Sequence, residues 1–94
     1  MEAIKAIKID KKDNVAVVLR KVEKGWGVVW TKDGETASVQ AMDTIPMYDK
    51  IAVRDIPAGE PVVKYGEHIG IAAMDIPAGS HVHVHNVRNH REAL

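Results

Sequence analysis

A turn-forming motif that occurs twice, with a spacing near 20 residues, limits the folds that this chain can adopt. Asp55–Val62 reads DIPAGEPV, and Asp75–Val82 reads DIPAGSHV. Proline at the second turn position would fix φ at about −65°, and the glycine two residues later can adopt a positive φ, so each copy predicts a tight turn between two short strands. Lys21–Val28 and Ile45–Ile51 are weaker copies. Four copies at this period are too few for a propeller or a solenoid, and they favour a compact structure of folded-over hairpins.

The segments around these turns have the patterns of short strands, because β-branched residues alternate with polar ones or form short apolar runs. The sequence between Lys32 and Gly34 predicts a hairpin turn. No segment shows a sustained helical period with caps. We therefore expect an all-β fold of short strands and tight turns in one domain over residues 1–94, with a flexible tail at 88–94. The expected strands are Ile7–Ile9, Val15–Leu19, Gly27–Trp30, Ala37–Met42, Lys50–Val53, Pro61–Tyr65, His68–Ala72 and Ser80–Val87.

Composition excludes several classes of function. The 13 basic and 13 acidic residues balance, so the chain has no positive field that would bind nucleic acid or an anionic membrane. The absence of cysteine excludes disulfides, thiolate metal sites and cysteine nucleophiles. The longest apolar run is too short to cross a bilayer and the N-terminus has no signal-peptide pattern, so we expect a cytoplasmic protein. With no phenylalanine, the core must consist of valine, isoleucine, alanine and methionine, and Trp26 and Trp30 are expected in a small core or an interface.

Three alternating histidines, His81, His83 and His85, form the sequence feature best suited to chemistry. On a strand they would share one face at intervals of about 7 Å, with Val82 and Val84 pointing into the core. Neutral imidazoles in such a row can bind a metal ion or an anion, or can transfer protons near neutral pH. The spacing also allows a second interpretation, in which these histidines are surface residues without a functional role. Lys64 and Tyr65 could bind a carboxylate and donate a proton, or could be ordinary surface residues.

Several motifs together resemble the SAF domain of the altronate dehydratase family. The resemblance is clearest over Lys50–Asn86, in Lys64-Tyr65-Gly66, in Ile69-Gly70, in the two Asp-Ile-Pro turns and in the final HVHVHN. Galactarate dehydratase and the small subunit of (R)-sulfolactate sulfo-lyase have similar domains. The resemblance implies a β-clip fold and a lyase that removes water or sulfite β to a carboxylate, with a divalent metal such as Fe²⁺ or Mn²⁺.

The resemblance also implies roles for individual residues and for a partner. A chain with this domain alone is similar to the small subunit of a sugar-acid dehydratase, whose large catalytic subunit is a separate chain. A homo-oligomer is also compatible with the sequence. The implied catalytic residues are His83 and His85, the implied substrate-binding residues are His81, Lys64, Tyr65 and Asn86, and the implied metal ligands are His83, His85 and Asp49.

One departure from the family pattern lies at Tyr48 and Asp49. The family has Pro-x-Gly-His-Lys where this chain has Pro46-Met47-Tyr48-Asp49-Lys50. An aspartate in place of histidine provides a harder, charged oxygen ligand. The substrate or metal can therefore differ from those of the family, and an alternative function is a non-catalytic module for sugar-acid binding or for assembly.

Overall fold

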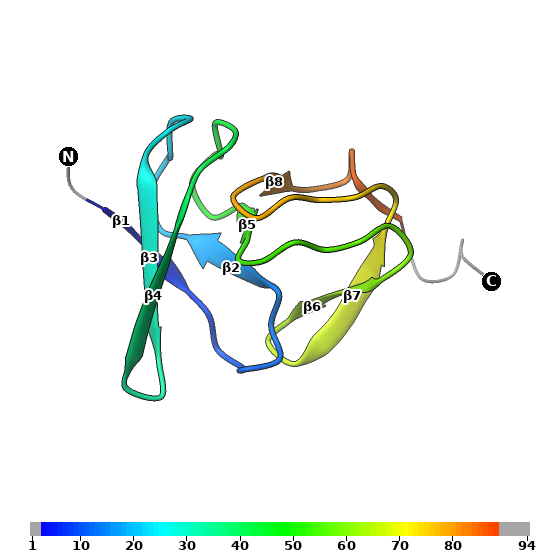
Figure 1. Cartoon of the computed structure of the whole chain (residues 1–94), viewed down its shortest axis with the longest axis horizontal. Coiled ribbons are helices and arrows are strands. Elements are labelled where there is room, and N and C mark those ends of the chain that lie inside the picture. Colours follow the sequence, from blue (N-terminus) through cyan, green and yellow to red (C-terminus); the bar gives the residue numbers. More distant parts are fainter. Residues whose placement is uncertain (1–2, 89–94) are drawn as a thin grey trace.

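The computed structural model describes residues 3–88, and its strands form two sheets with no helix among these residues (Figure 1). The all-β prediction is therefore confirmed. None of the described segments forms a helix that could cross a membrane. The expected tail lies outside the described residues, apart from Arg88. The strands are β1 (Ile4–Ile7), β2 (Val15–Val18), β3 (Gly27–Lys32), β4 (Glu35–Gln40), β5 (Lys50–Ala52), β6 (Pro61–Lys64), β7 (Glu67–Ala72), β8 (His81–Val82) and β9 (Val87–Arg88).

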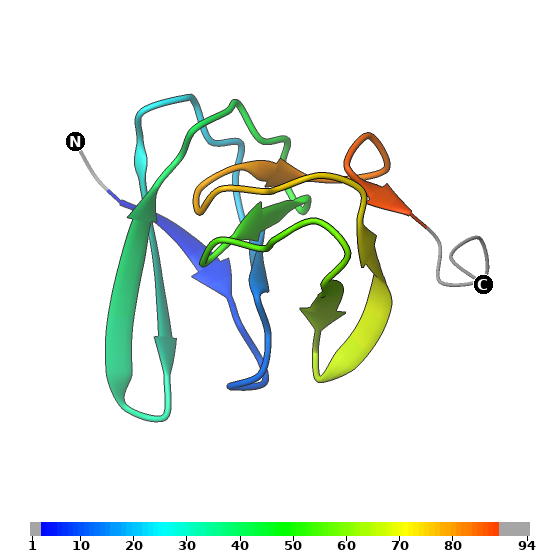
Figure 2. The same ribbon diagram turned by 45° about the vertical axis from the view of Figure 1, so that its right-hand side comes forward.

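The six-stranded sheet has the order β4-β3-β1-β2-β5-β8, and the three-stranded sheet has the order β6-β7-β9. Neighbouring strands are antiparallel except β1 and β3, which are parallel. The β3–β4 hairpin lies at one end of the molecule and the β6–β7 hairpin at the other (Figure 1). Figure 2 shows β5 (green) and β8 (orange) side by side between them.

Valine, isoleucine and alanine fill two core clusters, as predicted. The predicted contribution of methionine is wrong, because within the described residues neither cluster contains one and Met42, Met47 and Met74 are exposed. Trp30 is buried and Trp26 packs against the larger cluster, so the expected core role of the tryptophans is confirmed. The first strand differs from the prediction. It spans Ile4–Ile7 with Ile4 buried, whereas Ile7 and Ile9 are exposed. The predicted strand therefore lies two to three residues too far along the chain.

All four copies of the turn motif fold in the same way. In each copy a backbone N–H donates to the carbonyl three residues earlier, at 3.0–3.1 Å, in the pairs Trp26–Glu23, Asp49–Pro46, Glu60–Pro57 and Ser80–Pro77. The residue before the donor has a positive φ, which is the signature of a type II turn. The prolines occupy the first turn position and accept the closing hydrogen bond, rather than the second position that we expected from their fixed φ.

A strand begins two residues after the positive-φ residue in every copy, at Gly27, Lys50, Pro61 and His81. The next residue is then a fully buried aliphatic side chain, namely Val28, Ile51, Val62 or Val82. The turn therefore determines both where a strand starts and which of its faces packs in the core.

The copies associate in two antiparallel pairs. Ile56 and Ile76 exchange two backbone hydrogen bonds of 2.8 Å, and Val22 and Ile45 exchange bonds of 2.9 and 2.8 Å. All four side chains are buried. In the first pair, Asp55 Oδ1 accepts from the backbone N–H of Ala78 and Asp75 Oδ1 accepts from that of Ala58. Each motif is therefore held by its partner as well as by its own turn.

Two buried polar residues connect β2 to the β6–β7 hairpin. The Asn14 amide donates to Pro61 O and accepts from Val63 N–H, at 2.9 and 2.8 Å. Asp13 accepts from the backbone N–H of Gly66 at 2.8 Å. These contacts join the two sheets through groups that would be costly to bury without partners.

The histidine segment departs most from the prediction. β8 ends at Val82, residues 83–86 form a turn, and Val84 is 81% exposed rather than buried in the core. Asn86 explains this result, because its Oδ1 accepts from His83 N–H at 3.0 Å and its Nδ2 donates to His81 O at 2.8 Å. A short amide side chain can compete in this way with ladder hydrogen bonds.

Replacing Tyr48 with glycine is expected to stabilise the protein. Tyr48 has φ +71° where the other three copies have glycine, and its side chain is 65% exposed. A left-handed conformation costs a non-glycine residue about 1–2 kcal/mol, of which glycine's extra chain entropy offsets a part. Tyr48→Gly should therefore raise the free energy of unfolding by up to about 1 kcal/mol, measured by urea denaturation. The control is Gly59→Ala at the same turn position, where φ is +87° and a Cβ meets no neighbour, and it should be destabilising. A loss of stability in Tyr48→Gly would contradict this interpretation.

Replacing Asn86 with alanine is expected to loosen the histidine turn. Asn86 is 5% exposed, and its removal leaves the His83 N–H and the His81 carbonyl without their partners. The expected loss is about 1–3 kcal/mol in the free energy of unfolding, with an unchanged denaturant slope. Gln40→Ala is the matched control, because this exposed amide also donates to a backbone carbonyl, that of Gly25. Equal effects of the two substitutions would argue against a special role of Asn86.

Candidate metal centre

Asp49 and His81 reach the same place from two neighbouring strands. Asp49 immediately precedes β5, and His81 opens β8, which pairs with β5. The Nε2 of His81 lies 2.8 Å from Oδ2 of Asp49, and the two side chains are 18% and 27% exposed. The backbone N–H of His81 also donates to Asp43 Oδ2 at 2.9 Å. Hydrogen bonds therefore hold the backbone of both Asp49 and His81 in place.

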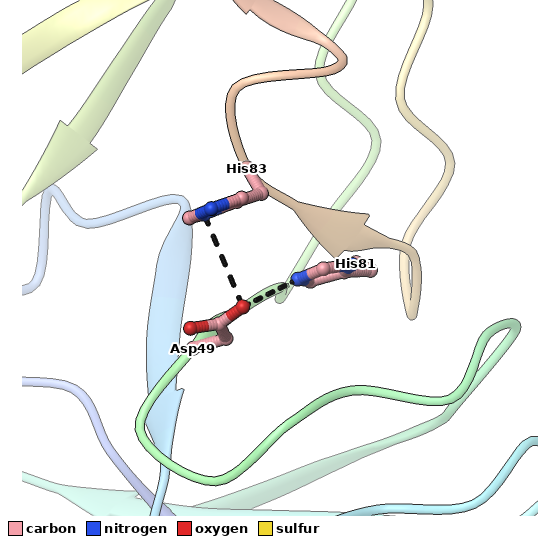
Figure 3. Close-up of side chains that lie close together, drawn as sticks. All are labelled: Asp49, His81 and His83. Carbon is pink, nitrogen blue, oxygen red and sulfur yellow. Dashed lines mark hydrogen bonds and ion pairs between the residues drawn. The ribbon is translucent and has the colours of Figure 1, made fainter.

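His83 completes a group of three. Its Nδ1 lies 3.9 Å from the same Asp49 oxygen, and its ring stacks on that of His81 with centroids 5.6 Å apart. Figure 3 shows the carboxylate of Asp49 facing the two imidazoles. The turn held by Asn86 brings His83 back over His81, so the two rings converge although the strand has ended.

His85 lies beside this group but not in it. Its ring centroid is 5.3 Å from that of His81, with the planes tilted by 40°, and the residue is exposed. Among the described residues, the ligand atoms that lie within 4.8 Å of one another belong to Asp49, His81 and His83. The structure therefore brings together Asp49 and His83 from the expected ligand set, and it adds His81 in place of His85.

The donor set of this cluster fits a divalent transition metal. Two imidazoles and one carboxylate suit non-haem Fe²⁺, and such nitrogen and oxygen donors also bind Mn²⁺. Ligand atoms about 2.1 Å from an ion and at right angles to each other are about 3 Å apart, close to the 2.8 Å between Asp49 and His81. A small movement of His83 toward Asp49 would give the third position.

A groove of about 260 Å³ opens beside the cluster, lined by Lys50, Ile69, His83, Val84, Val87 and Arg88. Neither Lys50 nor Arg88 was among the predicted site residues. The repeat contained a signal for Lys50, because this residue occupies the same position in its motif as His81 does in the last one. Burial, followed by repulsion from Lys64, lowers the pKa of Lys50, and Asp49 partly opposes this effect. Lys50 is thus a half-buried cation next to the cluster.

The remaining expected site residues differ in their surroundings. Lys64 is close enough to Lys50 to repel it, and its Nζ also lies 5.0 Å from the centroid of the Tyr65 ring. Tyr65 has φ +55° in the tight β6–β7 turn and is exposed. The Asn86 amide is occupied by the backbone of the histidine turn. Substrate contacts by these three residues remain predictions.

Comparison with known proteins agrees with the resemblance to the SAF domain. The family model described as the altronate/galactarate dehydratase SAF domain matches residues 4–90. This match extends over all strands of both sheets and includes the complete Asp49, His81 and His83 cluster.

Named relatives fall into two groups. Altronate dehydratase from Bacillus subtilis is 40% identical over 87% of this chain, and altronate dehydratase from Escherichia coli is 42% identical over 94% of it. The chain spans only 16% and 17% of the length of these two proteins. The (2R)-sulfolactate sulfo-lyase subunit alpha from Chromohalobacter salexigens is 40% identical over 80% of this chain, and there the match spans 82% of the relative. By these matches, the chain belongs to the SAF domain family of altronate and galactarate dehydratases.

Proposed function

We propose that this chain is the small subunit of a lyase that eliminates water from a sugar acid, and that it contributes Asp49, His81 and His83 to a divalent metal site. The observation that carries the proposal is the convergence of two imidazoles and one carboxylate within 4.8 Å, in a domain whose relatives are dehydratases and a sulfo-lyase subunit. The preferred metals are Fe²⁺ and Mn²⁺, because of the mixed nitrogen and oxygen donors.

The reaction class gives each residue a task. Elimination β to a carboxylate removes the α proton, places extra negative charge on the carboxylate, and releases the β-hydroxyl with a proton. A bound divalent ion would supply Lewis-acid stabilisation of that charge. Asp49, His81 and His83 would hold the ion. His85, exposed beside His81 and outside the ligand group, is free to exchange a proton with the leaving hydroxyl.

The rest of the active site would come from a large catalytic subunit. Three ligands from one small domain leave metal positions open, and the carboxylate and imidazole groups are partly exposed at the surface. The coverage of 82% and 94% of two sulfo-lyase subunits alpha supports an arrangement in separate chains. The isolated chain should therefore bind metal weakly and should have no lyase activity.

Metal titration separates the ligand set in the structure from the one implied by the sequence. In anaerobic titrations with Mn²⁺, followed by electron paramagnetic resonance, Asp49→Asn and His81→Ala should weaken binding by at least about tenfold. His85→Ala and the control His68→Ala should bind like the unmodified chain. An effect of His85→Ala as large as that of His81→Ala would favour the set His83, His85 and Asp49 instead.

Reconstitution with the large subunit tests the enzymatic role. The tagged chain, purified from its native cells, should co-purify with a polypeptide similar to the remainder of altronate dehydratase. The complex should convert altronate, galactarate or sulfolactate, and His83→Ala should lower turnover by at least about 100-fold without loss of assembly. Unchanged turnover with weakened assembly would support a non-catalytic assembly module. Absence of both partner and turnover would overturn the proposal.

A further inference from the structure

The groove beside the metal ligands brings together cations from both sheets. Lys50 lies on β5, a central strand that pairs with β2 and β8, so its backbone is held on both sides. Arg88 lies on β9, at the edge of the three-stranded sheet. Both residues line the groove together with His83, and Lys64 on β6 is close enough to repel Lys50. The fold therefore concentrates positive charge from three separate strands in one place.

Within residues 3–88, neither Lys50 nor Arg88 forms an ion pair, and no side-chain hydrogen bond of either is seen. Asp49 is the nearby acid, but its carboxylate already faces the two imidazoles. Lys50 is half buried without an ion-pair partner, whereas Arg88 is exposed. A half-buried charge of this kind costs stability, and a folded protein commonly keeps such a group for function. The groove thus has the electrostatic character of an anion site.

The groove also has an apolar part. Ile69, Val84 and Val87 supply it, and Ile69 and Val84 are exposed to solvent. A volume of about 260 Å³ is slightly below the usual range for drug-sized ligands. A lining of both cations and aliphatic groups suits a small organic acid, whose carboxylate can bind the cations while its carbon chain contacts the aliphatic side chains.

We propose that Lys50 and Arg88 anchor the carboxylate of a small organic acid in this groove, next to His83. The choice of a sugar acid as the ligand rests on the proposed function, but the presence of an anion site does not. Because His83 lines the groove and also belongs to the ligand cluster, an acid anchored here would have its carbons adjacent to that cluster. Lys50 and Arg88 thus determine specificity for a carboxylate and bind it directly.

The test uses the full chain freed of metal ions with a chelating resin that is then removed, so that metal binding cannot contribute. Galactarate is titrated into the ¹⁵N-labelled protein and followed by NMR, with galactitol as the neutral counterpart. We expect shifts at β5, β9 and the histidine turn with galactarate only. Lys50→Met and Arg88→Met should each weaken binding by roughly tenfold or more, because each removes a charge-assisted contact. Lys24→Met, at an exposed turn position, is the matched control and should bind galactarate normally.

Denaturation of the same variants distinguishes a loss of the binding site from a loss of folding. Methionine retains the aliphatic part of the lysine side chain but removes a half-buried charge that Lys64 repels, so Lys50→Met should unfold at a higher denaturant concentration than the unmodified chain. Lost binding together with retained or increased stability supports the anion site. Equal binding of galactarate by all three variants, or equal binding of galactitol, would overturn it. A reconstituted lyase with normal KM in both groove variants would also refute the inference while leaving the proposed function intact.

Discussion

The reciprocal backbone hydrogen bonds between paired turn motifs are the constraint on which the other features depend. Ile56 and Ile76 are buried, and so are Val22 and Ile45, so their amide and carbonyl groups must find partners inside the protein. Each pair satisfies this demand with two bonds of 2.8–2.9 Å. The pairing fixes where the turns lie, and the turns fix where the next strands start. Asp49 and His81 meet because their motifs bring them to the starts of adjacent strands, at consecutive positions of the repeat.

Much of this fold could be predicted from sequence because its turns depend on local chemistry. Proline, glycine and alternating aliphatic residues indicated the turns and most strands, and the family motifs indicated the β-clip. The histidine segment could not be read in the same way. Its alternation is that of a strand, but Asn86 offers the backbone of His81 and His83 better partners than a ladder would. An alternating pattern indicates only which way side chains would point on a strand. Here the hydrogen bonds of the Asn86 amide determine that the backbone forms a turn instead.

The site was predictable to the extent that it lies within one segment or follows a family motif. The structure brings together Asp49 and His83, which the family motif predicted as metal ligands, and their role as ligands stays a prediction. Lys50 and Arg88 had no such signal, because they lie on strands of different sheets and line one groove only in the folded chain. Tyr48 illustrates the same limit. Its positive φ follows from the turn, but the reason for a tyrosine at that position does not. The exposed ring next to Asp49 is compatible with a contact in the larger assembly rather than with folding.

The pairing of motifs also has a consequence for how the chain folds. No motif can complete its backbone hydrogen bonds until a partner some 20 residues away has formed its own turn, as the contacts of Asp55 with Ala78 and of Val22 with Ile45 demonstrate. The chain must therefore lose the entropy of closing these loops before it gains most of the stabilising contacts between the motifs. Proteins dominated by such non-local pairings fold on millisecond to second timescales. A chain with these strands and this core should reach the native state slowly for its size, with the two motif pairs as the steps that set the rate.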